Sequence, residues 1–107
     1  MNKQKVLEDL QKFARDISEK ESMLRENNEK RLAEFLTVWR LMNFRFQNLI
    51  EKTDEDKIKS ELESMEIDLI SNMEFFLNHH VETLSDLYGA ALDGFYKMKK
   101  LITAYLP

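Results

Sequence analysis

Residues 51–56 read Glu51-Lys-Thr-Asp-Glu-Asp56 and form the clearest break in a chain that otherwise lacks helix-breaking residues. The 107 residues include only two glycines and one proline, which is the last residue. A sheet needs turn residues between its strands, and this composition supplies too few for several hairpins. Thr53 and Asp56 have the spacing of a variant capping box, which predicts that a new helix begins here. The sequence therefore predicts an all-α protein with two halves.

Apolar residues recur with a helical period on both sides of this break. One stripe runs from Val6 to Ile50 and the other from Ile58 to Tyr105, and each keeps its phase throughout. Continuous phase predicts a long antiparallel helical hairpin that forms a single domain, residues 1–107. Because each stripe is wider than the seam of a two-stranded coiled coil, we expect the hairpin to dimerise into a four-helix bundle.

Two weaker breaks, at residues 27–28 and 78–80, leave an alternative open. If both halves bend there, the chain forms a compact monomeric four-helix bundle. A third arrangement has three helices, one of which ends near Tyr88. In the long hairpin, Asn28 and His80 lie level with one another and are expected to form a buried polar layer.

Small residues in the second half of the chain lead to two further predictions, one about helix packing and one about a helix end. Ala91 and Gly94 lie on the apolar stripe, which predicts that another helix packs closely against them. Gly89 lies on the polar side, where glycine costs about 1 kcal/mol relative to alanine. It therefore marks a hinge or a helix end.

The charge distribution and hydropathy of the chain indicate where the protein is located and which class of partner it binds. The formal net charge is −4, which argues against non-specific binding to nucleic acid. Acidic residues concentrate in 51–68 and lysines near both termini, so the hairpin is expected to have one acidic and one basic end. No run of about 18 apolar residues occurs, and the first residues turn acidic where a signal peptide needs an apolar run. We expect a cytoplasmic protein without membrane contact.

Residue types that carry chemistry are scarce. The absence of cysteine excludes disulfides, zinc–thiolate sites and thiol nucleophiles. His79, Glu82 and Asp86 share one helical face, but such sets arise by chance on charged helices, and we predict no metal site. No glycine-rich phosphate loop occurs. The expectation is therefore a protein that is not an enzyme and holds no cofactor.

Residues 35–50 contain no acid and are the best candidate for a binding surface. Most of their apolar residues, including Trp39 and Phe46, belong to the core stripe. An exposed apolar strip flanked by arginines has the composition of an interface hot spot. The opposite face of this helix carries such a strip, formed by Thr37, Arg40, Leu41, Phe44, Arg45 and Asn48.

We therefore predict a non-catalytic helical protein-binding module of the adaptor, chaperone or inhibitor type. The strip is expected to contact a second copy, giving a homodimer, or a protein partner that the sequence does not identify. The alternative is a nucleic-acid-associated protein, because arginines and aromatic rings stack on bases. That alternative relies on Arg40, Arg45 and the terminal lysines, which are Lys3, Lys5, Lys12, Lys97, Lys99 and Lys100.

Overall fold

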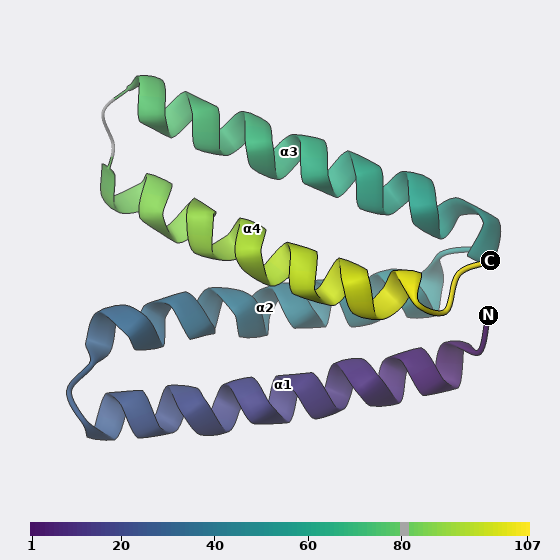
Figure 1. Ribbon diagram of the computed structural model, residues 1–107, viewed down its shortest axis with the longest axis horizontal. Helices are drawn as coiled ribbons and strands as arrows, with labels where there is room; N and C mark the ends of the chain where they lie inside the picture. The colour runs from purple at the N-terminus through teal and green to yellow at the C-terminus, as the bar shows by residue number, and fades with distance from the viewer. Residues whose placement is uncertain (80–81) are drawn as a thin grey trace.

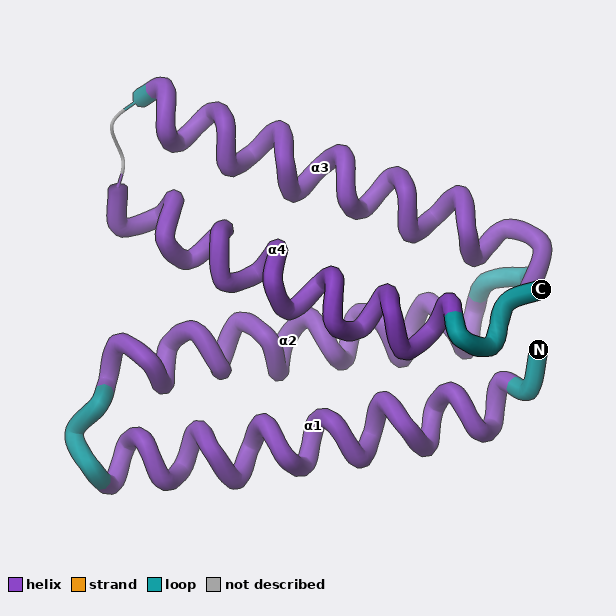
Figure 2. The backbone as a smooth tube through the Cα atoms, in the orientation of Figure 1, coloured by secondary structure: helices purple, strands orange, loops and turns teal. Residues whose placement is uncertain are grey.

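The computed structural model describes the backbone of residues 1–79 and 82–107, with their side chains except those of residues 76, 77 and 82–85. Four α-helices and one short 3-10 helix follow one another, with no strand in the described part of the chain (Figure 2). They are α1 (Lys3–Glu26), α2 (Lys30–Lys52), η1 (Glu55–Lys57), α3 (Ile58–Asn78) and α4 (Glu82–Thr103). The predicted all-α class is confirmed.

The chain reverses direction between α1 and α2, at a place without glycine or proline. Asn28 has a φ of 59°, in the left-handed region that asparagine tolerates better than most residues with a side chain. The Glu29 amide donates to the Leu24 carbonyl oxygen at 2.8 Å, which satisfies one of the last carbonyls of α1. The predicted long hairpin is therefore wrong, and the arrangement is the alternative with four shorter helices.

The break near residue 53 is confirmed, although its chemistry differs from the prediction. Thr53 is the extended residue that ends α2, and its amide donates to the Leu49 carbonyl oxygen at 3.0 Å. Asp54 precedes η1, and its side chain makes no capping hydrogen bond. The predicted capping box of Thr53 and Asp56 is wrong, because Thr53 closes one helix and does not open the next.

Two other expectations about helix ends also fail. α4 continues through Tyr88 and Gly89, so the hinge and the three-helix arrangement are both wrong. Asn28 lies exposed in the turn and contributes to no buried polar layer. Its expected partner, His80, lies outside the described residues.

The four helices form a thin slab, with extents of 39 × 34 × 19 Å. α4 lies between α3 and the α1–α2 pair and packs on α2, α1 and α3 (Figure 1). The core lies along α4, where the Phe46 and Phe95 ring centroids are 5.6 Å apart. Other fully buried side chains are Val6, Leu10, Ile50, Ile58, Leu62, Met98 and Ile102.

The α3–α4 pair thus supplies the apolar cover that we expected a second copy to provide. The width of the apolar stripes therefore no longer requires a second copy of the chain.

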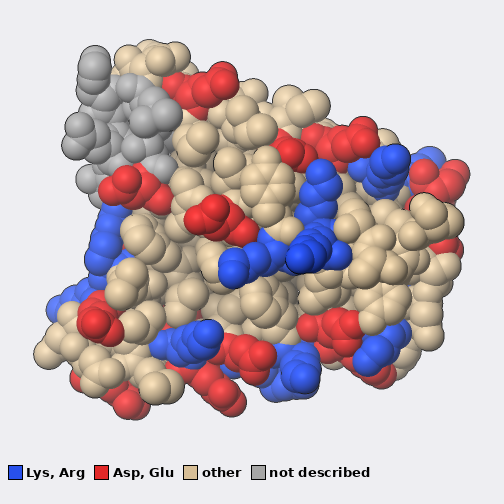
Figure 3. Space-filling model, viewed as in Figure 1, with Lys and Arg blue, Asp and Glu red and all other residues tan. Residues whose placement is uncertain are grey.

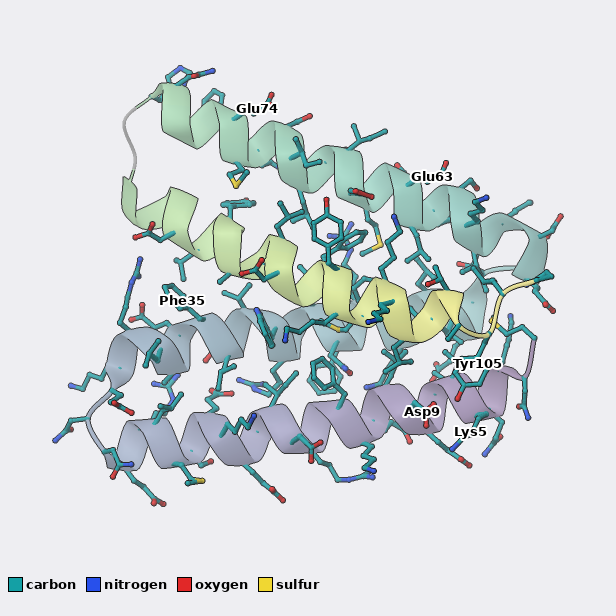
Figure 4. All side chains as sticks on the ribbon, viewed as in Figure 1. Lys5, Asp9, Phe35, Glu63, Glu74 and Tyr105 are labelled. Atoms are coloured by element: carbon teal, nitrogen blue, oxygen red, sulfur yellow. The ribbon has the colours of Figure 1, made fainter. Side chains whose placement is uncertain are left out.

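Both termini lie at the end of the slab that also holds the connection 53–57 (Figure 1). Lys3 Nζ donates to the Thr53 carbonyl oxygen at 2.7 Å. The Tyr105 hydroxyl donates to the Asp9 carboxylate and joins the C-terminal segment to α1 (Figure 4). The expected separation into an acidic and a basic end is therefore wrong, because basic termini and the acidic connection meet.

α2 and α4 approach closely where α4 has small residues. Trp39 Nε1 donates to the Ala90 carbonyl oxygen at 2.6 Å, and the indole ring lies over Gly94. Ala91, which precedes Gly94 by about one turn of α4, is also buried. The predicted close packing at Ala91 and Gly94 is confirmed.

Candidate functional site

The side of α2 that points away from the core carries exposed apolar and polar side chains. We call this surface the α2 ridge and define it as Leu41, Phe44, Arg45 and Asn48, all of which are exposed. Their spacing of three and four residues places them on one face of the helix. Leu41 is 59% exposed and Phe44 is 55% exposed, whereas Asn43 between them is fully buried. The predicted exposure of these two apolar side chains is confirmed.

A groove runs along one side of the α2 ridge, between α1 and α2. Its volume is about 500 Å³, and Phe44 forms part of its wall. The α1 residues that line it are Gln11, Ala14, Arg15, Ser18 and Glu19. The groove exists because the chain reverses at residue 28 and lays α1 beside α2.

A second groove lies on the other side of the α2 ridge, where α2 meets the start of α3. Its volume is about 270 Å³, and Arg45 and Asn48 line it together with Lys52, Glu61 and Met65. The α2 ridge therefore stands between two grooves. Helices pack by inserting the ridge of one into the groove of another, so a surface of this shape fits a partner helix.

Thr37 and Arg40, the other two predicted site residues, are partly buried and bind a residue of α1, and Arg40 also lines the first groove. Both bind the carboxylate of Glu21 in α1, which is only 8% exposed. The Arg40 Nε atom donates to Glu21 Oε2 at 2.9 Å, and the Thr37 hydroxyl donates to Oε1 at 2.8 Å. Arg25 is a third neighbour, with its guanidinium 3.4 Å from Oε1. The structure therefore places these two residues beside the α2 ridge as links between α1 and α2.

This cluster changes the acidity of Glu21. The hydrogen bond from Arg40 is the largest cause that lowers the pKa of Glu21, and the hydrogen bond from Thr37 adds to it. Burial of the carboxylate raises the pKa, but the hydrogen bonds outweigh this effect. Glu21 therefore stays ionised in the folded protein and neutralises the Arg40 charge.

The lowered pKa of Glu21 predicts a loss of stability in acid. The unfolded chain has the ordinary pKa of 4.5, so Glu21 stabilises the fold fully above that pH. Stability falls as the pH drops from 4.5 through the lower folded pKa. We expect Glu21→Gln to lower the free energy of unfolding at pH 7 by about 1–3 kcal/mol. Urea unfolding of both proteins at pH 7 and pH 3 measures this.

The difference between the two proteins should shrink at pH 3, because the Glu21 carboxyl of the unfolded chain is then protonated and must lose its proton on folding. The pKa values of Asp9 and Glu66 are also lowered, through hydrogen bonds from Tyr105 and Lys99. Glu21→Gln should therefore retain part of the acid sensitivity. A difference that stays constant between pH 7 and pH 3 would contradict a charged Glu21 in the fold.

Asn43 fixes how α1 and α2 align along the groove. Its Nδ2 atom donates to the Leu10 carbonyl oxygen at 2.9 Å, inside the core. Its Oδ1 atom accepts from Gln47 Nε2 at 2.6 Å, and Gln47 lines the groove beside Phe44. A buried amide satisfied in this way favours one register of the two helices. The shape of the groove therefore depends on a core residue.

Several basic groups of the nucleic-acid alternative are already paired. Arg40 binds Glu21, and Lys99 Nζ lies 2.9 Å from Glu66 Oε2. Lys3 donates to a backbone carbonyl oxygen of the 53–57 connection. Phosphate binding depends on positive charge that is available for neutralisation. No observation on the described residues favours this alternative.

Sequence reasoning missed the α1 side of the first groove. Arg15 and Ser18 became neighbours of Phe44 only through the reversal at Asn28, which the prediction treated as a weak break. A signal was present, since Glu21 falls near the centre of the apolar stripe of its helix. An acid at such a position indicates a buried polar partner on a neighbouring helix.

No protein-family model, curated protein or solved structure matches this chain. Among the described residues, no helix has the length and apolar character needed to cross a bilayer. The described side chains of residues 1–79 and 82–107 include no group of three metal-ligating residues that could hold a metal ion.

Proposed function

We propose that this protein is a non-catalytic helical protein-binding module of the adaptor, chaperone or inhibitor type. The α2 ridge is its binding surface, and a helix of a protein partner is its ligand. One observation carries this proposal: two large apolar side chains, Leu41 and Phe44, remain more than half exposed between two grooves. Exposed apolar surface of this kind, bordered by polar groups, is typical of protein interfaces.

The chemistry of the surroundings describes the expected partner. Residues 35–50 contain no acid, and Arg45 is exposed beside Phe44. A partner helix with an apolar stripe, and with carboxylates placed to meet Arg45, therefore complements the α2 ridge. The apolar stripe supplies most of the affinity, whereas the carboxylates set orientation and the rate of association.

Photocrosslinking in the cells that make the protein tests the proposal. A photoreactive phenylalanine analogue at Phe44 should capture a protein partner, and the same analogue at Leu32 should not. Leu32 is a suitable control because it lies on the same helix and is 50% exposed, but it borders a different notch, beside Trp39 and Ala90. Equal capture from the two positions would contradict the proposal.

The captured partner then permits a quantitative prediction. Phe44→Ala should weaken its binding by about 2 kcal/mol or more, as at other interface hot spots. Leu32→Ala should change the dissociation constant by less than about twofold. Titration calorimetry with each purified variant measures both, and thermal unfolding confirms that the variants remain folded. A partner bound equally well by both variants would show that it docks elsewhere.

A further inference from the structure

α3 carries a second exposed apolar surface, on the side that faces away from α4. We call it the α3 outer face and define it as Glu63, Ile67, Ile70 and Glu74. Their spacing of i, i+4, i+7 and i+11 places them along one face of the helix. Ile67 is 64% exposed, the highest value among the exposed large apolar residues in the described part of the chain. Ile70 is half-buried, so Ile67 is the main exposed apolar group between the two carboxylates.

Beyond Lys59, the charged side chains of α3 are all acidic. Residues 60–78 contain five acids, Glu61, Glu63, Glu66, Asp68 and Glu74, and no lysine or arginine. Acidic side chains line the edge of the molecule over α3 in Figure 3. Figure 4 shows Glu63 and Glu74 pointing away from α4.

The α2 ridge has the complementary composition. The charged residue of the α2 ridge is Arg45, which is exposed, whereas the α3 outer face carries Glu63 and Glu74. Glu19 and Glu61 line the grooves on either side of the ridge, so Arg45 is the group that attracts carboxylates. Each surface presents large exposed apolar side chains, Leu41 and Phe44 on one and Ile67 on the other. Burying apolar groups against each other while Arg45 meets carboxylates satisfies both surfaces at once.

These two surfaces cannot meet within one copy of the chain. Glu63 and Glu74 point away from α4 (Figure 4), and Ile67 between them along the helix is 64% exposed. α4 itself lies between α3 and the α1–α2 pair (Figure 1). On the α2 side, the residues of α3 that line the second groove with Arg45 are Glu61 and Met65, which lie on another face of the helix. A contact between the two surfaces therefore requires two molecules.

We infer that the α3 outer face of a second copy occupies the α2 ridge. This inference rests on the proposed function, since it uses the same ridge and names the partner. The contact is heterologous, because two different surfaces meet and each copy keeps one surface of each kind free. Such contacts produce open chains or closed rings, in contrast to the two-fold contact of an ordinary dimer.

Sedimentation velocity over a concentration series up to about 1 mM tests the inference. The wild-type protein should form a series of assemblies larger than a dimer as its concentration rises. Phe44→Asp blocks the α2 ridge and Ile67→Lys blocks the α3 outer face, so each variant alone should be monomeric. An equimolar mixture should form a heterodimer, because one variant retains each surface. Leu41→Asp provides a second ridge variant.

Controls separate this contact from general stickiness. Leu32→Lys, which charges an exposed apolar residue away from both surfaces, should associate as the wild type does. Raising the salt concentration should weaken the association, since exposed ion pairs are screened. Circular dichroism and thermal unfolding verify that each variant has folded.

Three results would overturn the inference. They are a wild-type protein that stays monomeric throughout, a dimer that Ile67→Lys leaves intact, and blocked variants that do not associate when mixed. The proposed function fails separately, when photocrosslinking at Phe44 captures no more than at Leu32. A monomeric chain that still captures a foreign protein through Phe44 would retain the function and lose the inference.

Discussion

Phe46→Ala should lower the free energy of unfolding by about 3–5 kcal/mol, the cost of truncating a buried phenylalanine. Phe46 is fully buried, and its ring packs against that of Phe95 at a centroid distance of 5.6 Å. The pair joins α2 to α4, so the cavity would open at the centre of the bundle. A domain of this size has about 5–15 kcal/mol of stability in total. The melting temperature should fall by roughly 15–25 °C.

Phe44→Ala provides the matched control, because it makes the same chemical change two residues away on the same helix. Phe44 is largely exposed, so this variant should lose less than about 0.5 kcal/mol. Urea unfolding followed by circular dichroism measures both variants. Equal losses would contradict the orientation of α2, since that helix would then bury the two rings alike. The comparison also shows whether Phe44 is available for binding without a role in folding.

Gly94→Ala should destabilise the fold by about 1–3 kcal/mol, although alanine favours helices more than glycine does. A Cβ atom at residue 94 would lie 2.7 Å from Trp39 Cδ1 and 2.9 Å from Cγ. The indole ring cannot easily move away, because its Nε1 atom is bound to the Ala90 carbonyl oxygen. The added methyl group therefore pushes α2 and α4 apart. Thermal unfolding monitored by circular dichroism measures the loss.

Gly89→Ala should have the opposite sign. Apart from its chain neighbours and the backbone of its own helix, no atom of the described residues lies within 4 Å of the position that a Cβ atom would take at Gly89. The free energy of unfolding should therefore rise by about 0.5–1 kcal/mol, because alanine has a lower backbone entropy than glycine in the unfolded chain. Since both glycines lie in α4, the difference between the variants isolates the contact with Trp39. A stabilising Gly94→Ala would show that α4 does not approach α2 at this point.

The sequence was sufficient to predict the class of fold and much of its core. Apolar residues at helical spacing, such as Leu10, Phe46 and Ile102, are buried as their periodicity indicates. The length of the helices could not be predicted in the same way. Asn28 reverses the chain through a left-handed backbone conformation, and an asparagine carries a weaker signal for that conformation than a glycine. The apolar phase continues across this turn and concealed it.

The candidate site was predictable to the extent that it depends on one helix. The exposure of Leu41 and Phe44 follows from the period of α2 alone. The roles of Thr37 and Arg40 depend on Glu21, which reaches them only after α1 folds back. The groove beside Phe44 depends on the same reversal. Properties that require the pairing of two helices were therefore missed.

The central claim is that the chain turns back at Asn28, so that α1 and the α2 ridge form one continuous surface. Because the chain contains no cysteine, spin labels can be attached at only two positions, through Gln11→Cys and Asn48→Cys. Both positions are exposed. Pulsed electron resonance should give a distance of about 20 Å, since packed helices lie roughly 8–10 Å apart and the labels add their own length. A distance near 55 Å, the length of 37 residues of straight helix at about 1.5 Å each, would contradict the account.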